Sequence, residues 1–93
     1  MTRNNPDPAP KLVVYSRRNC HLCDVAEAAL EALQQTVRFE IEVRDVDADA
    51  GWVAAYGDEV PVGMIGDRKV FKYRVDADKL TRALRSRTDR SVS

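Results

Sequence analysis

The only two cysteines of the chain, Cys20 and Cys23, are three positions apart and could form a dithiol that cycles with a disulfide. They lie where an apolar strand pattern gives way to a helical pattern. In the first turn of a helix, unpaired backbone N–H groups and the positive end of the helix dipole favour the thiolate form of a cysteine. We therefore expect Cys20 to attack a disulfide and Cys23 to resolve the resulting mixed disulfide.

Charged neighbours should influence this chemistry. Arg17 and Arg18, just upstream, add positive potential and are candidate substrate-binding residues, whereas a carboxylate at Asp24 would oppose thiolate formation. His21, a further candidate substrate-binding residue, lies between the cysteines, where an imidazolium would favour thiolate. An exposed His21 with no chemical role is the competing interpretation. The sequence therefore leaves open whether these neighbours lower or raise the pKa of the Cys20 thiol.

The acidic and sulfur-containing residues have three other possible interpretations. Two buried structural cysteines are possible in principle, but Cys20 falls in a polar loop. Zinc needs four ligands, and two cysteines with one histidine between them do not supply a set, so no metal is expected. Asp45, Asp47 and Asp49 do not match the register of a calcium loop, and helix capping in a solvated turn is the better interpretation.

Apolar periodicity predicts the elements that must position the dithiol. A continuous apolar run at 11–15 indicates a central strand, and strict alternation over 37–44 indicates a second strand. Between them lies a predicted helix from about Cys20 to Thr36, capped by Asn19. Strand, helix and strand in this order predict a right-handed unit with parallel strands. The expected inward face of the helix comprises Val25, Ala26, Ala29, Leu30 and Leu33.

The second half of the chain predicts a short helix, a hairpin and a last helix. The short helix should turn Trp52, Val53 and Tyr56 to one side and end at Gly57 in a left-handed conformation. Strands at 63–65 and 69–75 form the hairpin around Gly66-Asp67, with Phe71, Tyr73 and Val75 on one face. The last helix is expected to be capped by Asp76 or Asp78 and to bury Leu80, Ala83 and Leu84.

These elements make an α/β domain in the order β-α-β-α-β-β-α, with a four-stranded mixed sheet and helices on both faces. We expect residues 1–10 to be a disordered tail, residues 11–87 to be the domain, and residues 88–93 to be a flexible tail. Fifteen basic residues balance fifteen acidic ones, so net charge suggests neither nucleic-acid nor membrane binding. No apolar run is long enough for a membrane span or a signal peptide. A cytoplasmic monomer is the expectation.

With the Cys-x-x-Cys, the strand–helix–strand unit and the later Val60-Pro61-Val62 in place, residues 11–85 resemble the thioredoxin fold. The likeness is to small glutaredoxin-like proteins, in a divergent group with Cys-x-Leu-Cys. It implies a three-layer sandwich in which a cis peptide bond precedes Pro61. It also implies that Pro61 faces the dithiol and that the backbone of Val60 pairs with an extended thiol substrate.

Two departures from the family pattern bear on the substrate. The sequence Cys-His-Leu-Cys replaces the usual Cys-Pro-Tyr-Cys of glutaredoxins. The paired glycines that hold the γ-glutamyl end of glutathione are absent, and residues 73–78 read Tyr-Arg-Val-Asp-Ala-Asp. Asp76 or Asp78 is left to receive an amino group. Glutathione is thus an implied co-substrate with less support than the dithiol itself.

These features predict a thiol–disulfide oxidoreductase that reduces protein or glutathione mixed disulfides and holds no tightly bound cofactor. A reductase or glutathione would supply its electrons. The expected reduction potential is about −200 to −270 mV, the range of glutaredoxins and thioredoxins. One alternative is a thioredoxin-like module that binds a partner without turnover. Another is an iron–sulfur scaffold in which two chains share a cluster through Cys20, as some glutaredoxins do with glutathione.

Overall fold

The computed structural model describes the backbone of residues 9–92 and the side chains of residues 9–85. Its strands and α-helices follow one another along the chain in the predicted order. Most of the expected N-terminal tail (residues 1–8) lies outside the described residues, as do residue 93 and the side chains from 86 onward. The elements are β1 (Lys11–Ser16), α1 (His21–Leu33), β2 (Glu40–Asp45), η1 (Val46–Ala48), α2 (Ala50–Tyr56), β3 (Val62–Ile65), β4 (Arg68–Lys72) and α3 (Ala77–Val92).

The four strands form one mixed sheet in the order β2-β1-β3-β4. β1 pairs in parallel with β2, from Lys11 opposite Glu40 to Ser16 opposite Asp45. On its other edge β1 pairs antiparallel with β3, and β3 pairs antiparallel with β4 across the Gly66 turn. The predicted parallel pair and hairpin are therefore confirmed. β1 is central, so the loop that leaves its carboxyl end begins in the middle of the sheet.

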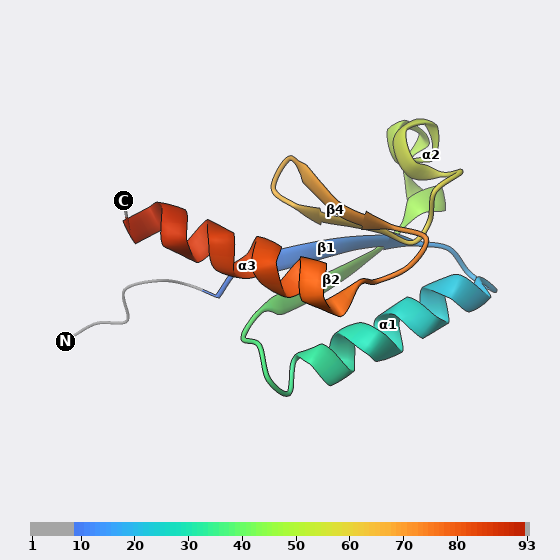
Figure 1. Ribbon diagram of the computed structural model, residues 1–93. Coiled ribbons are helices and arrows are strands. Elements are labelled where there is room, and N and C mark those ends of the chain that lie inside the picture. The colour runs from blue at the N-terminus through green and yellow to red at the C-terminus, as the bar shows by residue number, and fades with distance from the viewer. Residues whose placement is uncertain (1–8, 93) are drawn as a thin grey trace.

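Helices cover both faces of this sheet (Figure 1). Successive residues of a strand point to opposite faces, and β1 divides its side chains accordingly. Leu12 and Val14 join Leu30 of α1 and Leu80 of α3 in one apolar cluster. Tyr15 faces the other way and packs with Val46, Val62, Trp52 and Tyr56 beside α2. Its ring stacks on that of Tyr56, with the centroids 4.3 Å apart. The buried side of α3 contains Leu80, Ala83 and Leu84, as predicted.

The second strand begins later than its alternating pattern indicated. β2 starts at Glu40, although Phe39 is buried and Val37 packs against the core before the strand begins. Val43, expected on the buried face, is 48% exposed. β2 is an edge strand, so its last residues extend to a margin that helices cover less completely. Alternation correctly identified a strand here but overestimated how much of it is covered.

Two details of the second half differ from expectation. Gly57 is not left-handed but has φ −55°. The reason for glycine there is space, because a Cβ would lie 2.6 Å from the carbonyl oxygen of Val53. β4 ends at Lys72, because Tyr73 adopts a φ of 67° and turns the chain out of the strand. Val53 and Tyr73, both expected on inward faces, are exposed.

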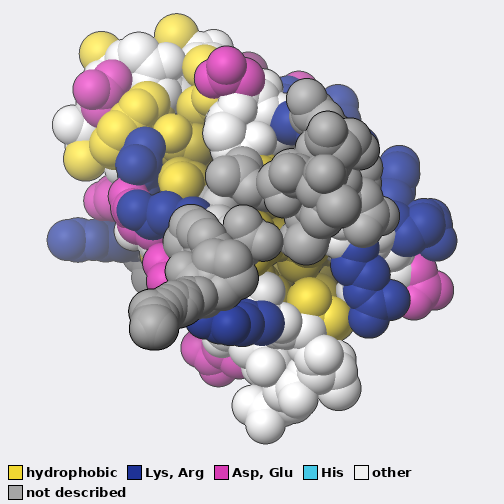
Figure 2. All heavy atoms as spheres, turned by 90° about the vertical axis from the view of Figure 1, so that its left-hand side faces the viewer, with side chains coloured by type: hydrophobic (Ala, Val, Ile, Leu, Met, Phe, Trp, Pro, Cys, Tyr) yellow, Lys and Arg dark blue, Asp and Glu magenta, His cyan; other side chains and the backbone are white. Residues whose placement is uncertain are grey.

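The surface carries charges of both signs. Figure 2 views the molecule from the left-hand side of Figure 1, and there Lys and Arg side chains lie among Asp and Glu side chains. This mixture agrees with the zero net charge of the sequence. Among the helices in the described part of the chain, none is long and apolar enough to cross a membrane.

Candidate active site

The dithiol lies at the start of α1, immediately after a sharp turn of the backbone. Asn19 has a φ of 57°, a left-handed conformation that asparagine tolerates better than most residues. The prediction that Asn19 caps the helix is wrong. Its left-handed turn moves the cap one residue onward, so that Cys20 is the N-cap and its Sγ accepts a hydrogen bond from the Cys23 backbone N–H at 3.1 Å.

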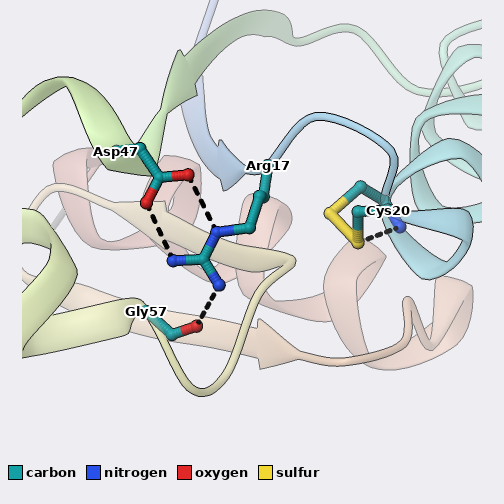
Figure 3. The surroundings of a disulfide bond; sticks show 5 residues. Arg17, Cys20, Asp47 and Gly57 are labelled. Carbon is teal, nitrogen blue, oxygen red and sulfur yellow. Dashed lines mark hydrogen bonds and ion pairs between the residues drawn. A yellow bond between two sulfur atoms is a disulfide. The ribbon is translucent and has the colours of Figure 1, made fainter.

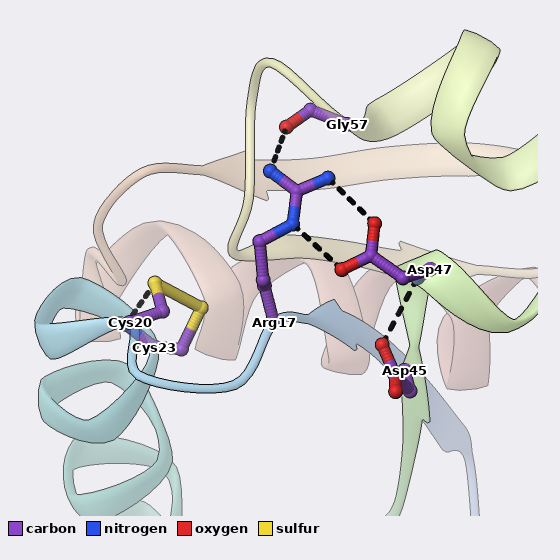
Figure 4. A network of polar contacts seen from close by, with 6 residues as sticks. All are labelled: Arg17, Cys20, Cys23, Asp45, Asp47 and Gly57. Atoms are coloured by element: carbon purple, nitrogen blue, oxygen red, sulfur yellow. Dashed lines mark hydrogen bonds and ion pairs between the residues drawn. A yellow bond between two sulfur atoms is a disulfide. The ribbon is translucent and has the colours of Figure 1, made fainter.

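Cys20 and Cys23 are joined by a disulfide, with their Cα atoms 5.2 Å apart (Figure 4). The two sulfur positions are not equivalent. Cys23 is 1% exposed and belongs to the inner side of α1, whereas Cys20 is half-buried at the helix end. A disulfide partner can therefore reach Cys20 more easily than Cys23. The Cys23 N–H, which donates to the Cys20 Sγ in this oxidised form, would also stabilise a thiolate on Cys20 after reduction.

Arg17, which precedes the dithiol, connects its loop with η1 and with the end of α2 (Figure 3). Its Nε and Nη2 donate to the two carboxylate oxygens of Asp47 at 2.9 and 3.0 Å, and its Nη1 donates to the Gly57 carbonyl oxygen at 3.1 Å. The hydrogen bond from Arg17 lowers the pKa of Asp47, and the same bond raises the pKa of Arg17. Substrate binding by Arg17 stays a prediction, and it must compete with this structural role.

The acidic loop after β2 caps helices, as its sequence suggested. Asp45 accepts a hydrogen bond from the Asp47 N–H at 2.9 Å, and Asp49 accepts from the N–H groups of Gly51 and Trp52 at 2.7 and 3.2 Å. Within the described residues, no group of three His, Cys, Asp or Glu side chains is arranged to hold a metal ion. The loop contributes to the site through Asp47, which anchors Arg17.

Arg18 and His21 flank Cys20 and are both exposed. Neither side chain makes a hydrogen bond or ion pair with another described residue. Both side chains are therefore free to contact a bound molecule. Their predicted roles in substrate binding remain untested.

The Val60–Pro61 peptide bond is cis, as the resemblance implied. Pro61 is buried, and its carbonyl oxygen accepts a hydrogen bond from the Tyr73 N–H at 2.8 Å. The Tyr73 hydroxyl donates to the Asp58 carbonyl at 3.2 Å, so the segment before the proline is tied to the end of β4. The N–H and carbonyl groups of Val60 make no hydrogen bond with any part of the described chain. They remain open for the predicted pairing with a substrate backbone.

Asp76 acts as the cap of α3. Its Oδ1 accepts from the Lys79 N–H at 3.0 Å, which confirms the capping prediction for this residue. One carboxylate oxygen is thereby engaged in the fold. Recognition of a substrate amino group by Asp76 stays a prediction.

The sequence interpretation missed an apolar groove beside the dithiol. Val25 and Ala29, assigned above to the buried face of α1, are exposed. The buried residues of the helix are Cys23, Ala26 and Leu30, and the same spacing one position earlier gives Leu22, Val25 and Ala29. This second apolar row is the sequence feature that could have indicated the groove, because it makes the helix apolar over a wider arc than its contacts with the core require. The groove is lined by His21, Leu22, Val25, Ala26, Ala29, Tyr73, Arg74 and Val75.

Comparisons with known proteins identify the family of this chain. Residues 11–85 match the family model described as Glutaredoxin-like domain (DUF836). The glutaredoxin-like protein YDR286C homolog of Dictyostelium discoideum is 38% identical over 72 residues, which span 71% of this chain and 67% of that protein.

Solved structures agree as well. Protein Ne2328 of Nitrosomonas europaea is 37% identical with a TM-score of 0.75, over 87% of this chain and 98% of that one. Protein XcR50 of X. campestris is 34% identical with a TM-score of 0.65, over 81% and 96% of the two chains. The chain therefore belongs to the glutaredoxin-like family, and it is a thioredoxin-like redox protein by its fold and its Cys20–Cys23 pair.

Proposed function

We propose that this protein is a thiol–disulfide oxidoreductase that reduces protein disulfides or mixed disulfides with glutathione. The observation that carries the proposal is the asymmetry of the bridged cysteines. Cys20 is half-buried and caps α1 through its sulfur, whereas Cys23 is buried one turn later. An accessible sulfur beside helix N–H groups suits the attacking thiolate, and a sheltered sulfur close by suits the resolving thiol.

The reaction is a two-electron exchange. The Cys20 thiolate attacks one sulfur of the substrate disulfide, the substrate S–S bond breaks, and the other substrate sulfur leaves as a thiolate that takes up a proton. A mixed disulfide now joins Cys20 to the substrate. Cys23 loses its proton and attacks Cys20, releasing the second substrate thiol and forming the Cys20–Cys23 disulfide. The substrate is reduced and the protein dithiol is oxidised.

Backbone pairing would hold the substrate during the attack. The free N–H and carbonyl of Val60 can pair with an extended substrate chain, and the ties from Tyr73 to Asp58 and Pro61 hold that segment in place. Of the three predicted binding residues next to the dithiol, Arg18 and His21 are available for a substrate carboxylate, since Arg17 is engaged with Asp47. Asp76 is the candidate for a substrate amino group.

Restoring the dithiol requires an external reductant. Two glutathione molecules, or a reductase dithiol, would supply the two electrons, and no resident cofactor is needed for either route. We place this activity in the cytoplasm, in a monomer that binds neither nucleic acid nor membrane.

The proposal is tested with single-cysteine variants and a disulfide-bonded peptide. The reduced protein should reduce the peptide, Cys20→Ser should abolish the reaction, and Cys23→Ser should accumulate the mixed disulfide, observed by mass spectrometry without reductant. A binding module without turnover would trap nothing in Cys23→Ser. Undiminished reduction by Cys20→Ser would also contradict the proposal.

A further inference from the structure

Apolar side chains gather in the groove beside the dithiol, which has a volume of about 410 Å³. Across the described residues, the large apolar side chains that remain exposed are Leu22, Val25, Val43, Val53 and Tyr73, and three of these five line this groove. Leu22 is 37% exposed, Val25 is 52% exposed and Tyr73 is 43% exposed. Contiguous exposed apolar surface next to a reactive group is typical of a binding site rather than of ordinary surface.

The groove begins at the reactive cysteines. His21 and Leu22, the two residues between Cys20 and Cys23, form its near end, and Val25 and Ala29 continue it along α1. In a chain that is disulfide-bonded to Cys20, the residues next to its own cysteine would therefore lie near this surface. The groove can thus contact the substrate side chains next to the reacting substrate cysteine.

The opposite wall contains a residue in an unfavourable conformation. Tyr73 has a φ of 67°, a left-handed conformation that is unfavourable for residues other than glycine. Tyr73 nonetheless lines the groove, and its hydroxyl donates to the Asp58 carbonyl at 3.2 Å. Glycine would relieve the backbone but would remove this wall. A large side chain kept in a conformation that favours glycine indicates a role for that side chain, which the hydrogen bond to Asp58 holds in place beside the groove.

The rim is basic. Arg74 lines the groove beside Tyr73, and its guanidinium makes no hydrogen bond or ion pair with another described residue. His21 occupies the end next to Cys20 and is likewise unpaired within the described chain. A ligand that combines an apolar side chain with a carboxylate would complement this surface in both polarity and charge.

We propose that this groove is a substrate subsite, and that it receives a bulky apolar side chain beside the disulfide-bonded cysteine of a protein substrate. Val25 and Tyr73 are its specificity-determining residues, and Arg74 favours a nearby carboxylate. The inference rests on the proposed reductase function and deepens it. Glutathione offers carboxylates but no apolar side chain to fill the groove, so a protein segment is the better-matched substrate.

The test compares three disulfides with the full-length reduced protein. Two are short peptides, each with one cysteine bonded to 2-mercaptoethanol, one with leucine on both sides of that cysteine and one with serine there. The third is bis(2-hydroxyethyl) disulfide, which is too small to fill the groove and reports the dithiol alone. Because burial of a leucine side chain is favourable, the leucine peptide should react with a kcat/KM about tenfold higher or more than the serine peptide.

Matched variants assign the preference to the groove. Val25→Ser should remove the leucine preference and leave the small disulfide unchanged, whereas Val25→Leu should retain the preference. Val53→Ser on α2 is the control, since Val53 is an exposed helical valine outside the groove. Arg74→Glu should lower the rate for a leucine peptide that contains an aspartate and raise it for one that contains a lysine.

The outcomes separate this inference from the proposed function. Equal rates for the two peptides, or an equal effect of Val25→Ser and Val53→Ser, would overturn the groove assignment while the reduction of the small disulfide upheld the reductase. Failure to reduce all three disulfides would overturn both proposals. A leucine preference that disappears only in Val25→Ser would support the subsite.

Discussion

Cys20 serves both the fold and the chemistry at the start of α1. Its sulfur accepts the Cys23 N–H, so the attacking atom is also the acceptor that completes the first turn of the helix. Substitution at this position therefore changes two properties at once. The choice of replacement can separate them, because a serine hydroxyl is a good helix cap and a methyl group is not.

We predict that Cys20→Ser and Cys20→Ala both lose disulfide reduction but differ in stability. The serine oxygen can take over the hydrogen bond from Cys23, so Cys20→Ser should be more stable than Cys20→Ala by about 1 kcal/mol. Urea unfolding of the two variants, followed by circular dichroism under the same reducing conditions, measures the difference. Equal midpoints would show that the Sγ contact does not contribute to helix stability.

Arg17 and Asp47 join separate elements of the fold. Arg17 follows β1, Asp47 lies in η1, and the Arg17 guanidinium also reaches the Gly57 carbonyl at the end of α2. The pair is exposed to solvent, so its contribution to stability is small and sensitive to salt. The hydrogen bonds of Arg17 hold the loop before Cys20 against the segment that leads from Gly57 to Pro61.

This pair should make stability depend on acid in a predictable direction. The pKa of Asp47 is lowered by Arg17, so its contribution is present above the ordinary value of 3.8 and is lost as pH falls through the lower folded-state value. Asp47→Asn should lower the thermal midpoint slightly at pH 7, and the difference from the unmodified protein should shrink below pH 3.8. Asp67→Asn is the control, since Asp67 forms no ion pair among the described residues. A constant difference from neutral to acid pH would contradict the assignment.

Packing between β3 and β4 depends on the absence of a side chain. A Cβ added to Gly63 would overlap the ring of Phe71, which is itself buried in the main core. We predict that Gly63→Ala lowers the free energy of unfolding by about 1–3 kcal/mol, the usual cost of overpacking. Phe71→Leu in the same chain should lessen the effect of Gly63→Ala. Additive losses in the double variant would show that the ring is not the obstacle.

One apolar cluster connects most of the molecule. Leu30 of α1 lies within it together with residues of β1, β3, β4 and α3, so loss of one contact should affect the whole domain. A domain of this size has a net stability of only about 5–15 kcal/mol. Each large buried side chain is therefore a substantial fraction of the total.

We predict that Leu30→Ala lowers the free energy of unfolding by about 2–5 kcal/mol and keeps a single cooperative transition. Val25→Ala, on the same helix but outward, should change it by about 0.5 kcal/mol or less. Chemical denaturation of both variants gives the comparison. Similar losses would mean that the row containing Val25 also contributes to the core.

Most of the fold follows from local patterns. The order of the elements along the chain, the positions of the helices and the cap at Asp76 were predictable because apolar spacing and short polar side chains act over a few residues. The errors occurred where a local pattern admits two answers. Val25 and Val43 are apolar in the correct period, but their burial depends on what packs above them. Tyr73 reads as a strand residue, and only the turn of the backbone takes it into the groove.

By itself, the sequence determined a dithiol at a strand–helix junction and the family to which the chain belongs, because both depend on residue type and spacing. Only the tertiary structure decided that the Cys20 sulfur caps α1, that Arg17 is engaged with Asp47, and that Leu22, Val25 and Tyr73 share one groove. The cap at Cys20 is a local contact, but it depends on the left-handed turn that the backbone takes at Asn19. The Arg17–Asp47 pair and the groove join residues far apart in the sequence, so they depend on how the elements pack together.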